Sequence, residues 1–90
     1  MAILPRIVAV STDERPLTLR VRWDNGDDSR VDVSGVIETF RRFEPLCRSS
    51  DLFGMVRVGE HGTDVVWTGG IDMAADTLWR LAQEQAGSPS

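Results

Sequence analysis

The stretch LTLRVRWDNGDDSRVDV, residues 17–33, contains the strongest periodic pattern in the chain. In its first seven residues, apolar side chains occupy every second position and polar side chains lie between them. Side chains of a β-strand alternate between the two faces of a sheet, so this pattern predicts a strand with one buried face. Residues 29–33 alternate in the same way, with Val31 and Val33 as the apolar pair. The stretch therefore predicts a β-hairpin.

The length of the hairpin loop decides which residues face each other. A two-residue loop would place apolar residues of one strand beside charged residues of the other, because a shift of one residue inverts every side chain. A three-residue loop over 24–26 pairs Leu19 with Val31 instead, and Gly26 then occupies the position that needs a positive φ. A five-residue loop keeps the same parity and remains an alternative.

The same register places charged residues on the outer face of the hairpin. Arg22 faces Asp28 and Thr18 faces Asp32, and opposite charges across two strands stabilise a sheet. The segment DNGDD, residues 24–28, does not match a calcium-binding loop. In a loop starting at Asp24, glycine occupies the third position rather than the sixth, and glycine also occupies the twelfth position, where a glutamate is needed. The run therefore predicts a turn with solvated carboxylates, and we expect no metal or cofactor.

Five other segments before the last helix have a strand or helix pattern: a strand over 6–10, a short helix that Ser34 can cap and that ends before Pro45, one helical turn over 49–53, and strands over 55–59 and 64–67. The sequence leaves two alternatives for the length of the loop around His61. A two-residue turn pairs Val58 with Val65. A three-residue loop pairs Val56 with Val66.

A final helix is predicted after the Gly69-Gly70 pair. Asp72 is its expected N-cap. Its apolar stripe at helical spacing consists of Ala75, Leu78, Trp79 and Ala82. The predicted fold is a single α+β domain over 1–85, with a small, mainly antiparallel sheet in the order strand-strand-strand-helix-strand-strand-helix and helices on one face. Residues 86–90 are expected to be a disordered tail.

Composition restricts the class of protein. The 90 residues carry a formal net charge of −4, which makes nucleic acid an unexpected partner for this chain because such binders usually present a basic patch. Cys47 is the only cysteine, which excludes an internal disulfide and suits a reducing compartment. No apolar run is long enough for a membrane span and no signal peptide is evident. We expect a soluble cytoplasmic protein.

Catalytic residues are not apparent in the sequence. Catalysis needs a nucleophile or base held beside its partner. The single histidine, His61, falls in a predicted turn, and Cys47 is expected to be a small buried apolar residue. The chain is therefore predicted not to be an enzyme.

A candidate surface for a partner or ligand follows from aromatic and arginine residues, which dominate binding hot spots. Trp67 and Trp79 are expected in the core, whereas Trp23, beside the polar turn, is either a core or a surface residue. The candidate surface comprises Arg20, Arg22, Trp23, Trp67 and Asp72.

An ordered set of short motifs resembles the small bacterial domain-of-unknown-function family 2442. The motifs are RI at residues 6–7, a strand ending in Trp-Asp-x-Gly, VDV at 31–33, F-x-P-L at 43–46, DLF at 51–53 leading to VRV at 56–58, and VVW-x-x-G-x-D at 65–72. They extend over about residues 6 to 80. The resemblance implies a small α+β domain without established activity, often encoded beside a second small protein in an arrangement similar to toxin–antitoxin pairs. Some relatives carry a C-terminal helix-turn-helix domain; we expect none in this sequence, so DNA binding by that route is not implied.

Two functions remain as hypotheses. The first is a non-enzymatic protein-interaction module, the antitoxin-like member of a two-gene pair, whose acidic charge favours a small basic protein encoded alongside. The second is a ligand-binding or sensing domain with a pocket near Trp67 and Asp72. A homodimer is also expected to be possible, because exposed sheet edges invite pairing.

Overall fold

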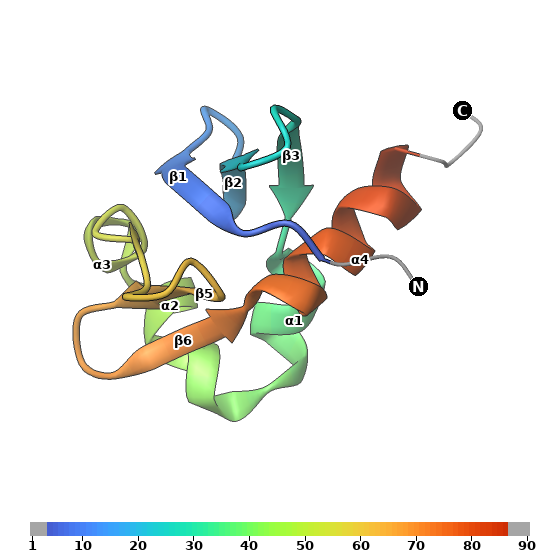
Figure 1. Ribbon diagram of the computed structural model, residues 1–90. Coiled ribbons are helices and arrows are strands. Elements are labelled where there is room, and N and C mark those ends of the chain that lie inside the picture. Colours follow the sequence, from blue (N-terminus) through green and yellow to red (C-terminus); the bar gives the residue numbers. More distant parts are fainter. Residues whose placement is uncertain (1–3, 87–90) are drawn as a thin grey trace.

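The computed structural model describes residues 4–86 as two three-stranded antiparallel sheets and a set of helices (Figure 1). The first sheet contains β1 (Ile7–Thr12), β2 (Thr18–Trp23) and β3 (Asp28–Asp32), in that order. The helical segment that follows consists of α1 (Ser34–Thr39), the 3-10 helix η1 (Arg41–Phe43), α2 (Glu44–Arg48) and α3 (Ser50–Phe53). The second sheet contains β4 (Arg57–Val58), β5 (Asp64–Trp67) and β6 (Ile71–Ala74), and α4 (Ala75–Ala86) follows it.

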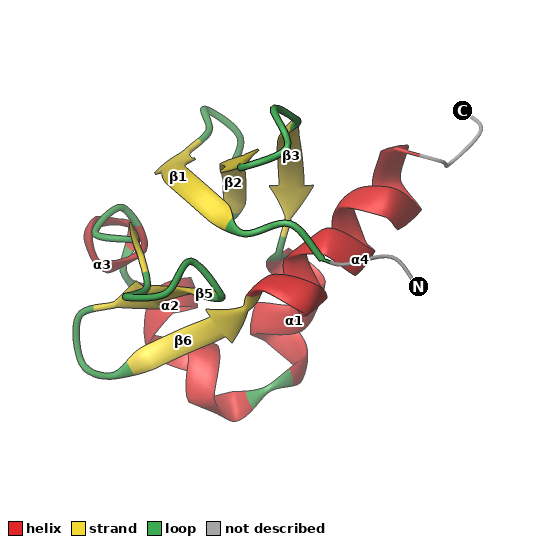
Figure 2. Cartoon of the chain, in the orientation of Figure 1, coloured by secondary structure: helices red, strands yellow, loops and turns green. Residues whose placement is uncertain are grey.

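The predicted α+β class and the antiparallel pairing are confirmed, with the strands divided between two sheets. In Figure 2 the first sheet fills the upper part of the molecule, and α1 and α2 lie in the lower part. Of the predicted tail, residues 87–90 lie outside the described part of the chain, and Ala86 is the last residue of α4. No helix in residues 4–86 has the length and apolar character needed to cross a membrane.

The first hairpin has the register predicted from its alternation. Leu19 faces Val31. The Trp23 N–H donates to the Asp27 carbonyl at 2.8 Å, so the loop between these two residues has three members. Gly26 has a φ of 93°, as the third loop position requires. The five-residue alternative is therefore wrong.

The second hairpin takes the first of the two predicted registers, since Val58 faces Val65. The strand that follows was not predicted. Asp72 lies in β6, opposite Val66, and α4 begins only at Ala75. The expectation that Asp72 caps the last helix is wrong, because Gly69-Gly70 turn the chain back along β5, both with positive φ, before the helix begins.

Two local expectations in the helical segment are wrong. Ser34 is the first residue of α1 rather than its cap, and its N–H donates to Oδ1 of Asp32 at 2.9 Å. Cys47 is exposed rather than buried. The five-residue helix α2 buries Leu46, and the adjacent position consequently faces solvent.

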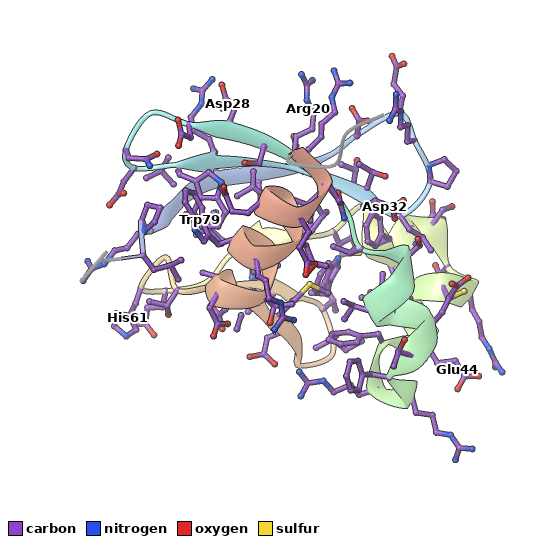
Figure 3. All side chains as sticks on the ribbon, turned by 90° about the vertical axis from the view of Figure 1, so that its right-hand side faces the viewer. Arg20, Asp28, Asp32, Glu44, His61 and Trp79 are labelled. Atoms are coloured by element: carbon purple, nitrogen blue, oxygen red, sulfur yellow. The ribbon has the colours of Figure 1, made fainter. Side chains whose placement is uncertain are left out.

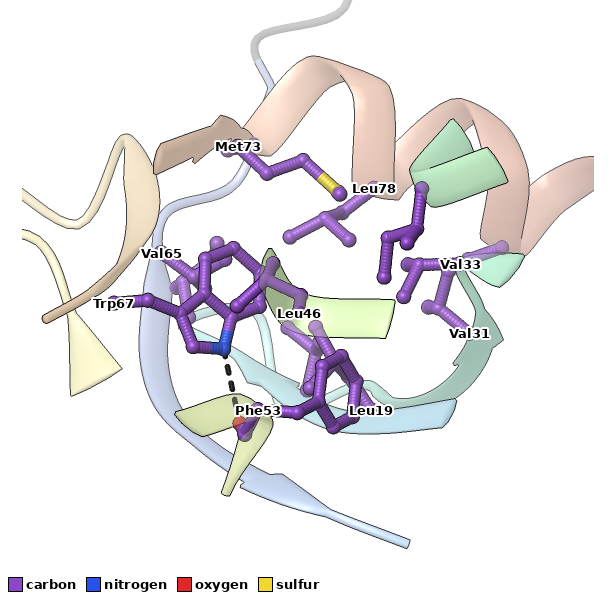
Figure 4. Packing of buried hydrophobic residues seen from close by; sticks show 14 of the residues in the cluster. Leu19, Val31, Val33, Leu46, Phe53, Val65, Trp67, Met73 and Leu78 are labelled. Atoms are coloured by element: carbon purple, nitrogen blue, oxygen red, sulfur yellow. Dashed lines mark hydrogen bonds between the residues drawn. The ribbon is translucent and has the colours of Figure 1, made fainter. Parts of the chain in front are cut away.

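A single apolar cluster joins both sheets to the helices (Figure 4). The predicted stripe on α4 is confirmed, with Ala75, Leu78 and Ala82 buried and Trp79 partly buried against the cluster. Every buried side-chain nitrogen or oxygen in residues 4–86 has a hydrogen-bond partner. The core therefore leaves no unsatisfied polar side chain in this part of the chain to mark a site.

Two glycines with positive φ are expected to respond differently to alanine. At Gly26 the space that an alanine Cβ would occupy is open, so Gly26→Ala should cost only the left-handed conformation, about 1–2 kcal/mol of unfolding free energy. Gly62 has a φ of 71°, and a Cβ there would lie 2.8 Å from the Ile7 carbonyl oxygen. Gly62→Ala should therefore cost more than Gly26→Ala in urea unfolding, and equal costs would contradict the close approach of these two segments.

Candidate partner-binding surfaces

Trp23 lies in the core and is only 1% exposed. Its Nε1–H donates to Ser29 Oγ at 3.1 Å, and its ring meets that of Trp79 edge-on, with centroids 5.0 Å apart. The side chain therefore has its polar contact and its aromatic contact within the fold. The structure assigns Trp23 to packing and does not place it on a partner surface.

Trp67 is also 1% exposed. Its Nε1–H donates to the Phe53 carbonyl at 2.9 Å, and the two rings stack with centroids 5.9 Å apart (Figure 4). Asp72 is exposed, and neighbouring positions on β6 point to opposite faces, so Ile71 rather than Asp72 lies beside Trp67. The fold does not bring Trp67 and Asp72 together around a pocket.

Arg20 and Arg22 lie exposed on the outer face of the first sheet, together with Arg30. The Arg22 Nε lies 3.0 Å from Asp28 Oδ1, which confirms the predicted cross-strand position. The Nε atoms of Arg20 and Arg30 lie 3.9 and 3.8 Å from Oδ1 of the largely buried Asp13. Carboxylates therefore balance much of the positive charge on this face.

A second surface, which the sequence did not indicate, lies where the short helices meet. It is a groove of about 780 Å³, which we call the η1–α3 groove, and it is lined by Arg41, Arg42, Glu44, Pro45, Arg48, Ser49 and Leu52. Pro45 lies in the first turn of α2. Ser49 Oγ accepts from the Leu52 N–H at 3.1 Å and caps α3. These two local features set the bend between the helices that forms the groove.

The charges of the groove are mainly positive. Arg48 forms an ion pair with Glu44 one helical turn away. The Arg42 guanidinium carbon lies 4.9 Å from the ring centroid of Phe43. The neighbouring Phe40 is 53% exposed, and its ring meets Phe43 edge-on. Exposed aromatic and arginine side chains around an apolar floor are typical of binding hot spots.

The single histidine and the single cysteine of the sequence lie in different parts of the fold. No group of three histidine, cysteine, aspartate or glutamate side chains in residues 4–86 is placed to hold a metal ion. His61 is exposed in the turn between β4 and β5, and Cys47 is exposed on α2.

Comparison with known proteins identifies the fold and the family. No curated protein matches the sequence. A solved structure from Nitrosomonas europaea, named a "putative DNA binding protein", is similar over 96% of this chain with 28% sequence identity and a TM-score of 0.81. The chain spans 54% of the length of that protein. The family described as "Protein of unknown function (DUF2442)" matches residues 7–84, and the chain belongs to that family.

Proposed function

We propose that this chain is a non-enzymatic protein-interaction module that binds its partner through the η1–α3 groove. The observation that carries the proposal is a groove in which three arginines lie beside the apolar residues Pro45 and Leu52. The exposed Phe40 directly precedes Arg41 in the chain. A partner that covers a solvent-exposed aromatic ring removes its apolar surface from water, which favours binding. Arginine supplies directed hydrogen bonds at the same interface.

The charges of the groove specify what the partner must present. Three arginines and one glutamate line it, so an apolar segment carrying carboxylates complements it. The net charge alone favoured a basic partner, but the local charge governs contact at the groove. A small protein encoded alongside, as the resemblance implies, would therefore need such an acidic apolar segment, and an antitoxin-like role would consist of covering that segment.

DNA binding is the function suggested by the name of the similar structure, and that name applies to a protein of which this chain spans 54%. The outer arginines of the first sheet face Asp13 and Asp28, and the whole chain carries a net charge of −4. Phosphate binding depends on uncompensated positive charge. In the groove, the apolar residues Pro45 and Leu52 lie among the arginines, and apolar surface of this kind favours a protein partner over nucleic acid.

The proposal predicts that charge reversal at the groove weakens partner binding. The double substitution Arg41→Glu and Arg42→Glu should lower the affinity for the product of the adjacent gene by at least about tenfold, the effect of one hot-spot residue of about 1.4 kcal/mol. Isothermal titration calorimetry measures the affinity of each variant for this partner. Arg20→Glu, on the first sheet, is the matched control and should leave the affinity unchanged.

Two results would contradict the proposal. One is failure of the native chain and the adjacent gene product to co-elute at micromolar concentration. The other is an equal loss of affinity for the groove variant and the control variant. A duplex DNA titrated in parallel should show no salt-dependent binding, and tight binding to it would replace the protein partner with nucleic acid.

A further inference from the structure

Strand β3 forms an outer edge of the first sheet. Along this strand, the backbone groups point alternately toward β2 and away from it. The Trp23 N–H donates to the Asp27 carbonyl and the Val33 N–H donates to the Leu17 carbonyl, which places the bonded pairs at every second residue of the hairpin. The intervening residues of β3, Asp28, Arg30 and Asp32, consequently direct their N–H and C=O groups away from β2. Figure 3 faces this side of the molecule, with Asp28 and Asp32 at the two ends of the strand.

The last of these three residues is already bonded. Gln85 on α4 accepts from the Asp32 N–H through Oε1 at 2.9 Å and donates to the Asp32 carbonyl through Nε2 at 2.9 Å. The side-chain amide thus takes the place of a neighbouring strand at this one residue. The backbone groups of Asp28 and Arg30 have no such partner within residues 4–86.

The opposite edge of the sheet is β1, which lies against the second sheet at one end. The strand β1 lies beside β4, and the Ile7 N–H donates outward to the Gly62 carbonyl at 2.8 Å. On β3, the part of the edge left without a partner among the described residues is the short stretch from Asp28 to Arg30. An unpaired edge of this kind is a template for another strand.

We propose that this stretch pairs antiparallel with the same stretch of a second copy of the chain, with Asp28 of each copy opposite Arg30 of the other. Each of the two residue pairs would exchange two backbone hydrogen bonds, because both residues direct their backbone groups outward. The two sheets, each of three strands, would join into one of six strands around a two-fold axis at Ser29.

Charge selects this register among the neighbouring ones. The next register that keeps outward-facing residues opposite each other is shifted by two residues. In one direction it places Asp28 opposite Asp28 of the second copy. A shift in the other direction places Arg30 opposite Arg30, and it also requires the Asp32 backbone groups that Gln85 occupies. Like charges directly opposite each other destabilise a sheet, whereas the proposed register sets a carboxylate against a guanidinium twice.

The second copy is a better occupant of this edge than an unrelated strand, since the edge is complementary to itself under a two-fold rotation. The stretch is short, so the dimer should be weak, and analytical ultracentrifugation of the native 90-residue chain should follow it up to about 1 mM. We expect the weight-average mass to rise from 10.0 kDa towards twice that value.

Two single substitutions test the register. Asp28→Arg and Arg30→Asp each create like-charge pairs in the homodimer, so each variant alone should remain monomeric at concentrations where the native chain associates. An equimolar mixture of the two variants restores both opposite-charge pairs and should form a heterodimer. The double variant, Asp28→Arg with Arg30→Asp, should associate as the native chain does.

The outcomes separate this edge from every other contact surface. A native chain that stays monomeric at the highest concentration overturns the proposal. Association that persists unchanged in both single variants overturns the register, and failure of the mixture to associate does the same. Circular dichroism melting of each variant shows whether it is folded, and the mixture experiment retains its meaning if both singles melt like the native chain. The result is independent of the η1–α3 groove, since Arg41→Glu with Arg42→Glu should leave self-association unchanged.

Discussion

Replacing Trp67 with alanine is expected to lower the free energy of unfolding by about 3–5 kcal/mol, the range for removing a large aromatic side chain from a core. The indole is almost fully buried, stacks on Phe53, and donates a hydrogen bond to the Phe53 carbonyl. Its loss removes the connection between β5 and α3 and leaves a cavity between them. Small domains have about 5–15 kcal/mol of stability in total, so the variant should be largely unfolded at moderate urea concentrations.

Trp67→Phe separates the two contributions of the indole. Phenylalanine keeps a ring against Phe53 but cannot donate to its carbonyl, so a cost of about 1–3 kcal/mol is expected from the unsatisfied acceptor. Urea unfolding followed by far-ultraviolet circular dichroism measures both variants. A Trp67→Ala cost below that of Trp67→Phe would contradict the packing of this residue as described.

Leu19→Asp is expected to have an effect at least as large, above about 4–5 kcal/mol, which is sufficient to prevent folding of a marginally stable domain. Leu19 is completely buried and faces Val31 across the hairpin. A carboxylate at this position would lie among apolar side chains without a partner, and a buried charge of that kind is costly.

The neighbouring residue provides the matched control. Arg20 lies on the opposite face of the same strand, 59% exposed, with Asp13 as its ionic partner at 3.9 Å. Exposed ion pairs contribute little, so Arg20→Ala should change the unfolding free energy by no more than about 0.5 kcal/mol. One-dimensional proton NMR distinguishes a folded from an unfolded chain. A folded Leu19→Asp variant would show that the alternation of this strand does not define the core.

The first hairpin could be predicted from sequence because parity leaves few choices. Only an odd loop length places Leu19 beside Val31, and Gly26 then falls where a positive φ is needed. Strand β6 could not be predicted in the same way, since its four residues contain a single fully buried side chain, Met73, and its Asp72 has the character of a helix cap. Short strands gain most of their stability from pairing, which is not visible in a local pattern.

The candidate surfaces were likewise predicted only where the local sequence pattern determines them. The sequence predicted that Arg20 and Arg22 would lie on an exposed face, and the structure places them there. It could not decide the position of Trp23, because the ring that covers it, Trp79, is far away in the sequence. The η1–α3 groove depends on the angle between three short helices, and tertiary packing sets that angle. The only local sign was the pair of aromatic residues around Arg41 and Arg42.

The hydrogen bonds between Asp32 and Gln85 connect residues 53 positions apart, and Trp23 packs on Trp79 over a similar interval. During synthesis on a ribosome, the amino-terminal hairpin leaves the exit tunnel long before the helix that covers it. The apolar face of the hairpin therefore remains exposed to solvent until almost the whole domain has been translated. The most strongly encoded element of this protein is consequently one of the last to gain its stability, and truncation of the final helical turns should affect the beginning of the chain as much as its end.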